Sequence, residues 1–415
     1  MFRRFWLDVI LGTIFIFALM GFFGSVTAFK IFDVFDPIGD ALSDMEITDI
    51  VFSQLRSEQI ADEDIILVNI GVEDRFGIAR LVDSISQHNP RVIGMDTFFD
   101  FPKEDALADG ALAEAFGRVD DLVLVTKMLY NIETDQFDSV RTSWPLFTWN
   151  SDSAFANFLT DAQSQEDLKM CRDFNPVLYD HTGKPHYAFA VELARRMDPE
   201  KTERFLARNN EIETVNYRGN VLDYGATKFG TKFIALDVYD VMVGNYVPEM
   251  IQDKVVIFCY LGKYLGDQES LEDKYFTPLN EKYVGRAFPD MYGGVIHANI
   301  VSMILNEDYI SALSDYTLIF IAVFLTFINV MAFSWIYKII PRWYDGVTKL
   351  IQAIEFLALM FLTIYILDLY ALKLDLTLTL VAVALVGDGL EVYFGVVKNA
   401  FTKEGRKELF RASRL

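Results

Sequence analysis

The sequence predicts an α/β domain with a mostly parallel sheet flanked by helices, joined to four transmembrane helices, one N-terminal and three C-terminal. The 415 residues are 52% hydrophobic and yet carry a net charge of −22, which indicates separate apolar and acidic segments. Apolar runs long enough to cross about 30 Å of hydrocarbon, roughly 20 residues, occur near both ends of the chain. Between them, short apolar runs alternate with helix-period sequence, as in a parallel sheet.

The apolar runs define the expected membrane helices, which are residues 5–29, 316–335, 350–367 and 376–397. The first follows Arg3 and Arg4 and resembles a signal peptide, but its length favours an uncleaved anchor. Most Lys and Arg near these runs lie before the first run, between the second and third, and after the fourth, whereas the loop 368–375 between the third and fourth holds only Lys373. The positive-inside rule therefore predicts that both termini are cytoplasmic. The expected segments are an anchor (1–29), an extracytoplasmic domain (30–315), three helices (316–397) and a basic cytoplasmic tail (398–415).

The net negative charge lies in residues 30–315, which carry −25 against +3 for the rest of the chain. A surface of that sign repels phosphate groups. Neither nucleic acid nor an anionic lipid surface is an expected partner of the outer domain.

Within the outer domain, short apolar runs predict strands buried on both faces, each followed by a helix. The expected strands are 65–70, 91–95, 122–127, 232–236 and 254–259. The expected helices are 75–88, 105–116, 187–197 and 294–306. The stretch from about 130 to 185 lacks clear periodicity, contains Trp144 and Trp149, and is interpreted as an insertion or lid.

Several segments resemble the CHASE2 family of extracytoplasmic sensory domains. They are EDIILVNIGVEDR (63–75), NPRVIGMDTFFD (89–100), KVVIFCYLG (254–262), DKYFTPLN (273–280), GGVIHANIVSMIL (293–305) and the less distinctive DMEITDIVFSQLR (44–56). The resemblance covers residues 5 to 397 and includes the layout of one N-terminal and three C-terminal helices. It implies a sensory role. Family members commonly continue into a cytoplasmic output enzyme, whereas about 18 residues follow Val397 here. We expect this chain to act through another subunit.

Sequence motifs for enzymatic chemistry are missing, including GxxxxGK[ST], HExxH, GxSxG and the kinase set. The four histidines are dispersed, and His181 and His186 in a turn-rich segment are more typical of solvated loops than of a metal site. We expect no enzymatic activity, no cofactor and no metal.

Ligands of open α/β sheets bind beyond the carboxyl ends of the strands. In this sequence those ends present a candidate ligand or partner crevice formed by Asp74, Arg75, Asp96, Asp100 and Tyr260. Mutual ion pairs and helix caps are the alternative role for these charged side chains.

The two cysteines, Cys171 and Cys259, would lie in an oxidising compartment, where a disulfide can form. Because Cys259 falls within a buried strand, a thiol that fills space in the core is the alternative.

Five polar side chains fall within the apolar runs: Asp8, Asn329, Glu355, Asp388 and Glu391. Charges in hydrocarbon cost at least about 2.5–3.5 kcal/mol each on insertion scales, so these groups should face a partner or the bundle interior. Three roles remain open. Asp8 and Glu391 can pair with Arg4 and Lys398 at the interface while Asn329 joins helices. The group can instead dock a basic or polar helix of another subunit, or form a proton path.

If these five polar side chains dock a helix of another subunit, small residues of the run 376–397 would permit the close helix contact. They are Ala382, Ala384, Gly387, Gly389 and Gly395.

The leading hypothesis is a non-enzymatic sensor or adaptor of the bacterial inner membrane with a periplasmic main domain. It would bind a ligand or envelope partner outside and act through transmembrane contacts with another subunit. The alternatives are a structural or accessory subunit of an envelope complex and an ion-coupled transport or motor component.

Overall fold

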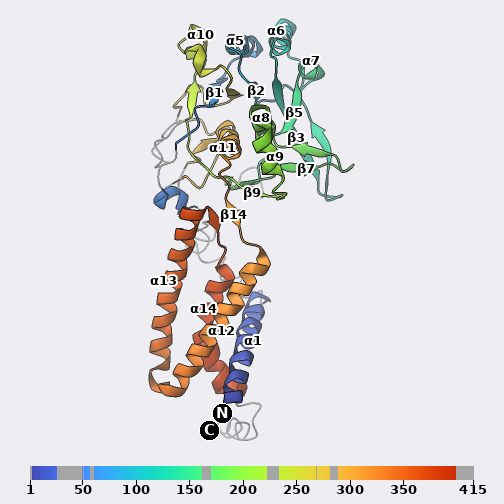
Figure 1. Cartoon of the computed structure of the whole chain (residues 1–415). Helices are drawn as coiled ribbons and strands as arrows, with labels where there is room; N and C mark the ends of the chain where they lie inside the picture. The colour runs from blue at the N-terminus through green and yellow to red at the C-terminus, as the bar shows by residue number, and fades with distance from the viewer. Residues whose placement is uncertain are drawn as a thin grey trace. The chain divides into compact units, whose positions relative to one another are not determined.

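A computed structural model of the chain describes residues 2–25, 49, 51–56, 60–160, 170–221, 233–267, 269–280 and 288–398 (Figure 1). The chain divides into two compact units. Thr48–Ile310 forms an α/β unit, and Met1–Ile47 together with Ser311–Leu415 forms a helical unit.

A seven-stranded mixed sheet forms the centre of the α/β unit. Its strands run in the order β10 (Ile234–Leu236), β1 (Ile65–Asn69), β11 (Val255–Cys259), β2 (Val92–Met95), β3 (Leu122–Asn131) and β4 (Gln136–Arg141), and β5 (Asp152–Phe155) also pairs with β3. All neighbours are parallel except β3 and β4, which pair antiparallel. The α/β class is therefore confirmed, with an antiparallel pair added to the parallel strands.

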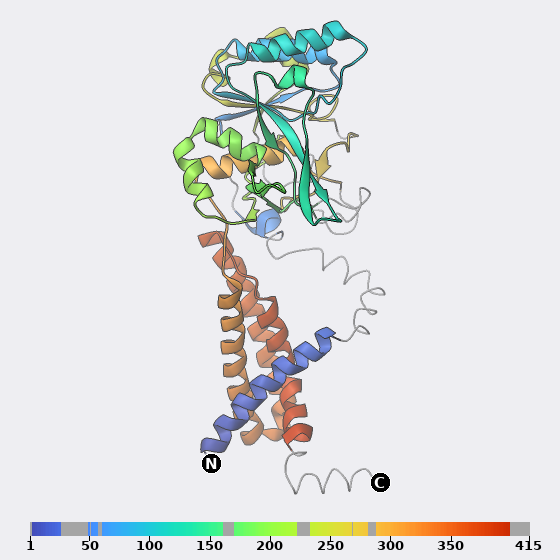
Figure 2. The ribbon, with the colours of Figure 1, turned by 90° about the vertical axis from the view of Figure 1, so that its right-hand side faces the viewer.

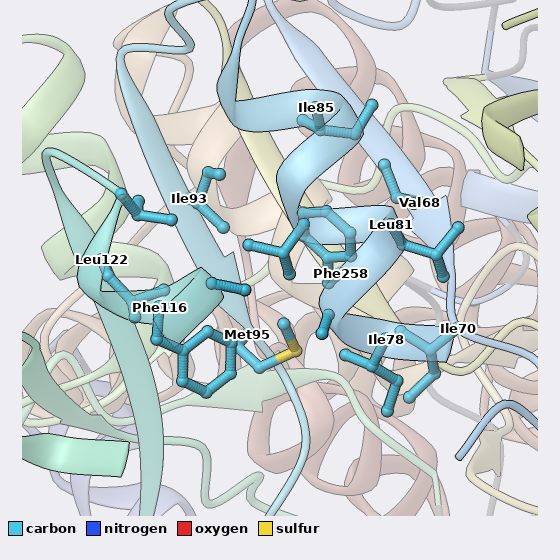
Figure 3. Close-up of a cluster of buried hydrophobic side chains, with 14 of the residues drawn as sticks. Val68, Ile70, Ile78, Leu81, Ile85, Ile93, Met95, Phe116, Leu122 and Phe258 are labelled. Carbon is cyan, nitrogen blue, oxygen red and sulfur yellow. The ribbon is translucent and has the colours of Figure 1, made fainter. Parts of the chain in front are cut away.

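The central strands are apolar throughout because helices cover both faces of the sheet. Every residue of β1, β2 and β11 is buried. On one face, helices α5 (Arg75–Ser86) and α6 (Ala106–Gly117) build the main core with α10 (Val238–Val243). Figure 3 shows Leu81, Ile85 and Phe116 of α5 and α6 beside Val68, Ile93, Met95 and Phe258 of the strands.

The other face is covered by α8 (Phe189–Met197) and α11 (Gly293–Leu305). Gly94 of β2 allows α8 to approach, since a Cβ at Gly94 would lie 2.6 Å from the ring of Phe189. Figure 1 shows these helices on the side of the sheet opposite α5 and α6. This is the layered arrangement that alternating strands and helices predict.

The interpretation of residues 130–185 as an insertion or lid is wrong for its first part. The segments β4 and β5 extend the sheet, and Phe147 of α7 (Pro145–Thr148) is buried in the main core. No apolar run marks β4, because four of its six residues are exposed and none is fully buried. Figure 2 shows the long β3–β4 ribbon at the edge of the unit.

Shorter elements complete the α/β unit. They are η1 (Val51–Leu55), β6 (Asp173–Phe174), β7 (Val177–Tyr179), β8 (Pro185–Tyr187), α9 (Pro199–Leu206), β9 (Glu213–Thr214), η2 (Pro248–Met250), β12 (Lys274–Tyr275) and β13 (Met291–Tyr292).

Among its described residues, the helical unit contains four helices long and apolar enough to cross a membrane, at the positions that the apolar runs predict. Its elements are α1 (Phe2–Ser25), β14 (Ser311–Ala312), α12 (Asp315–Ile339), η3 (Pro341–Trp343), α13 (Tyr344–Tyr370), β15 (Leu372–Lys373), α14 (Thr377–Val392) and η4 (Tyr393–Val397). Helix α1 crosses α12 and α14 (Figure 2). Small residues enable this crossing, since a Cβ at Gly389 would overlap Ile16 and one at Gly12 would lie 3.0 Å from Val330.

Candidate functional site

Asn69 organises the carboxyl edge of the sheet. This fully buried side chain accepts hydrogen bonds from the N–H groups of Gly71 and Leu261, at 3.0 and 2.9 Å. Its Nδ2 donates to Asp237 Oδ1 and to the Gly262 carbonyl, at 2.9 and 3.1 Å. All hydrogen-bonding positions of the amide are thus used. One side chain ties together the loops that follow β1, β10 and β11, so its role is structural.

Arg75, predicted for the crevice, is instead buried in an ion pair with Asp109 of α6. Its Nη2 donates to the Phe101 carbonyl at 2.7 Å, and its guanidinium lies over the Phe147 ring, 4.9 Å from the centroid. Burial by itself would raise the pKa of Asp109, but the hydrogen bonds from Arg75 and from the Lys103 N–H lower it below its ordinary value. This pair joins the start of α5 to α6.

Two of the predicted crevice aspartates also have structural partners. Asp74 is the N-cap of α5 and accepts from the Gly77 N–H at 2.8 Å. Asp100 forms an ion pair with Arg141 of β4. Helix capping and ion pairing, the alternative that the sequence left open, describe both residues, although Arg75 takes Asp109 rather than a crevice aspartate.

Asp96 and Tyr260 remain near the beginning of α11. Burial, and secondly the charge of Asp273, raises the pKa of Asp96 well above its ordinary value. Gly294 makes the close approach of α11 to β11 feasible, since a Cβ there would overlap the Cys259 sulfur and lie 3.7 Å from Asp96 Oδ2. Tyr260 contacts Tyr292 edge to face and shares a 3.0 Å hydrogen bond with Ser270.

The two cysteines are both described, and they are buried thiols that are not joined in a disulfide. The disulfide option is corrected for a topological reason: Cys259 ends the central strand β11 and packs against α11, so its sulfur is enclosed by that helix. Burial, then the charges of Asp96 and Asp273, raises the pKa of the Cys259 thiol well above its ordinary value. A thiol in that state is a poor nucleophile.

His297 of α11 is enclosed between the rings of Phe158 and Phe189. Burial lowers its pKa to about 3, and neither ring nitrogen has a hydrogen-bond partner among the described residues. His186 contacts Asp180 Oδ2 at 3.0 Å within a turn. In the ranges that the structure describes, no group of three or more His, Cys, Asp or Glu side chains is placed to hold a metal ion.

In the helical unit, the polar side chains pair between helices. Asn329 of α12 donates to Glu355 Oε1 of α13 at 2.9 Å, and Lys349 of α13 donates to Asp388 of α14 at 2.6 Å. The helix-joining role expected for Asn329 is thus found.

One predicted pair in this unit is corrected. Lys398 contacts Asp8 of α1 at 2.6 Å and is not paired with Glu391, because α1 packs directly against α14. Glu391 lies on the exposed side of α14. The side chain of Arg4, the expected partner of Asp8, lies outside the described residues.

A cavity of about 590 Å³ opens at the amino edge of the sheet. Arg91, Asp121 and Asp152 line it from the starts of the neighbouring strands β2, β3 and β5, and Arg195 and Arg196 line it from the end of α8. The lining charges, completed by Glu192, balance at three of each sign. A volume of this size holds a small organic ligand.

Comparison with known families decides the identity of the chain. The family model described as CHASE2 domain matches residues 33–333, most of the chain. The chain belongs to the CHASE2 domain family. CHASE2 is an extracytoplasmic sensory domain, so the match supports a sensor role. Searches of curated proteins and of solved structures find no match.

The CHASE2 motifs occupy the structural centre of the domain. EDIILVNIGVEDR forms β1 and the turn into α5, KVVIFCYLG forms β11 with its following loop, and GGVIHANIVSMIL is α11. NPRVIGMDTFFD forms β2 and carries Asp96 and Asp100. Of DMEITDIVFSQLR, only Asp49 and residues 51–56 lie within the described part. The CHASE2 signature is therefore largely a signature of the sheet core.

Sequence reasoning missed the residues whose partners lie far along the chain. Asp109, 34 positions from Arg75, sits in the first turn of α6, where an acidic side chain is expected from the helix dipole alone. The amino-edge cavity was also missed, because Arg91 and Asp121 directly precede two apolar runs and look like ordinary polar ends of strands. The order of the strands in the sheet was the missing information.

Proposed function

We propose that this CHASE2 chain is a non-enzymatic sensor or adaptor of the bacterial inner membrane. Its α/β unit lies in the periplasm and binds a ligand or an envelope partner, and its helical unit acts through contacts with another subunit. The excess of Lys and Arg in the flanks on the side of the two termini supports cytoplasmic termini. The raised pKa of Cys259 and the lowered pKa of His297 favour a role without covalent or acid–base catalysis.

The exposed acidic face of α14 carries this proposal. Ala384, Asp388 and Glu391 lie three or four positions apart, on one side of the helix, and all three are exposed. The Asp388 side chain is 60% exposed even though it pairs with Lys349. Carboxylates facing hydrocarbon cost about 2.5–3.5 kcal/mol each on insertion scales, which a partner helix with basic or polar side chains would offset. A second polypeptide on this face explains why the acids point outward.

The small residues of α14 divide between two roles. Gly387 and Gly389 pack inside the helical unit, where a Cβ would meet Gln352 and Ile16 respectively. They therefore serve the packing of this chain's own helices, which corrects the expectation that they form the docking seam. Ala384 lies on the exposed face beside Asp388. The docking face accordingly consists of Ala384, Asp388 and Glu391.

The α/β unit has a direct connection to the membrane helices through the end of α11. Lys201 of α9 donates to the Leu305 carbonyl at 2.7 Å, and Arg204 of α9 pairs with Glu307 at 2.7 Å. Arg218 pairs with Asp308 at 3.0 Å. The chain then continues into α12, so a displacement of α9 would pull on the residues that lead into the first C-terminal membrane helix.

Photo-crosslinking tests the docking face. A photoreactive residue replaces Ala384 in the full-length protein in its native membrane, and the matched control replaces Leu357, a 55% exposed residue of α13. We expect position 384 to crosslink to a defined polypeptide and position 357 to crosslink mainly to lipid. Asp388→Asn together with Glu391→Gln should reduce the protein crosslink at 384. Lipid adducts alone at both positions would contradict the proposal.

An ion-coupled role is the second candidate, and Glu355 favours it. One oxygen of this carboxyl accepts from Asn329, but Oε2 is buried without a hydrogen-bond partner among the described residues. Under this alternative, Glu355→Gln abolishes function while expression and crosslinking at 384 persist. Full function in Glu355→Gln and in Asp388→Asn would remove this candidate.

A further inference from the structure

We propose that the amino-edge cavity, formed between Arg91, Asp121, Asp152, Arg195 and Arg196, binds a small zwitterion with an ammonium and a carboxylate group, such as an amino acid or a short peptide. The site deepens the proposed sensor function, on which its signalling consequence rests.

The sheet topology builds the cavity from rigid parts. In parallel strands the amino ends meet at one edge, and the registers set Ile93 beside Leu122 and Val123 beside Asp152. Arg91, Asp121 and Asp152 therefore lie together although they are far apart in sequence. The end of α8 closes the site, since Arg91 Nε donates to the Arg196 carbonyl at 2.8 Å.

The arginines have spare capacity for an anionic group. A guanidinium carries five N–H donors. Arg196 Nη2 donates to Asp152 and Arg195 Nη1 donates to Glu192, and neither guanidinium makes a second hydrogen bond within the described part of the chain. Arg196 also approaches Asp121 only to 3.7 Å, beyond hydrogen-bond distance. A ligand carboxylate can supply acceptors to this pair of arginines.

Asp121, which lies 3.7 Å from Arg196, has spare capacity for a cationic group. Burial raises the pKa of Asp121 above its ordinary value despite the nearby Arg196 and Arg91, and the charge of Asp152 adds to the shift. The Asp121 carboxylate is thus incompletely stabilised by its neighbours. The end of α8 contributes the negative end of the helix dipole, which attracts cations. An ammonium group of the ligand beside Asp121 would stabilise this carboxylate.

The balance of charge sets the ligand class. Three cationic and three anionic side chains line the cavity and in part pair with one another, so the lining carries no net charge and favours a ligand without net charge. A molecule that carries both charges satisfies both sets, and about 590 Å³ admits an amino acid or a short peptide.

Binding at this site would reach the membrane helices through α8 and α9. Arg195 and Arg196 end α8, and α9 begins at Pro199, which also lines the cavity. Helix α9 in turn holds Leu305 and Glu307, directly before the chain leaves the α/β unit.

Thermal unfolding of the full-length protein in detergent tests the binding step. The probes are a pool of the twenty standard L-amino acids and a pool of dipeptides, each with an N-acetylated counterpart that lacks the ammonium group. At 100 times Kd we expect one unmodified pool to raise Tm by roughly 5–10 °C. The acetylated pools should give little shift. Which pool acts distinguishes amino acids from peptides.

Variants locate the site. Asp121→Asn and Arg196→Lys should each lower the affinity at least tenfold, whereas Arg141→Lys, a paired arginine at the opposite edge of the sheet, should leave it unchanged. The absence of any shift with either pool on folded protein would overturn the inference. So would an equal shift with the acetylated pools, or affinity undiminished in Asp121→Asn. Ligand binding without a change in the crosslink at position 384 would leave this inference standing and count against the proposed function.

Discussion

Replacement of Arg75 by Met is expected to destabilise the α/β unit strongly at neutral pH. The variant leaves the carboxylate of Asp109, which is 3% exposed, without its guanidinium partner. Removing one member of a buried ion pair costs about 3–5 kcal/mol. For a unit of this size each kcal/mol lowers Tm by about 2–4 °C, so Tm should fall by roughly 6–20 °C.

The loss should depend on pH with a defined sign. In the wild type the folded-state pKa of Asp109 lies below its ordinary value of 3.8, so the pair contributes fully above that pH and is lost as pH falls through the lowered pKa. Without Arg75, burial dominates and raises the folded pKa of Asp109. The destabilisation of Arg75→Met relative to wild type should therefore be largest at pH 7 and shrink towards pH 4.

Thermal unfolding of full-length protein in detergent at pH 7 and pH 4 measures both effects. The matched control is Arg118→Met, which breaks an exposed pair with Asp83 (side chains 53% and 42% exposed) and should cost at most about 1 kcal/mol. The double variant Arg75→Met/Asp109→Leu removes both charges and should recover most of the loss. If Arg75→Met stays within about 1 kcal/mol of wild type at pH 7, the burial argument fails.

Three further variants are expected to change stability. Gly294→Ala should destabilise by about 1–3 kcal/mol because its Cβ overlaps both the sulfur and the Cβ of Cys259; a neutral effect in thermal unfolding would refute the close approach of α11. His297→Phe should be more stable than wild type by about 2 kcal/mol at pH 5, since the unfolded histidine takes up a proton below pH 6.5 and the folded one only near pH 3. If the variant and the wild type have the same free energy of unfolding at pH 5, this reasoning is wrong. Lys398→Met should weaken the α1–α14 contact, measured as a lower detergent Tm, and adding Asp8→Asn should restore it; no rescue would argue against that pair.

The strands and helices of the α/β unit were largely predictable. Helices cover both faces of the strands in segments such as 65–70 and 254–259, so nearly every residue there is apolar. A run of this kind is visible in the sequence. The strand β4 was not predictable, since its residues are exposed at the sheet edge and form no continuous apolar run. The resemblance to CHASE2 was visible because the family motifs are these core segments.

The candidate site was much less predictable. The general rule for open α/β sheets directs attention to the carboxyl edge, and the sequence offered Asp74, Arg75 and Asp100 there. In the structure these three cap a helix or form ion pairs, and a cavity with balanced lining charges lies at the amino edge. Local spacing does not reveal whether a charged side chain has found a partner.

By itself, the sequence determined the division of the chain into apolar helices and an acidic α/β domain, because transfer free energies depend on composition along short stretches. Only the tertiary structure decided which partner each charged group takes. Arg75 meets Asp109 across 34 positions, and Lys398 meets Asp8 across 390. Such pairs depend on how helices and strands are ordered in space, and electrostatic contact needs a separation of a few ångströms that no local pattern encodes.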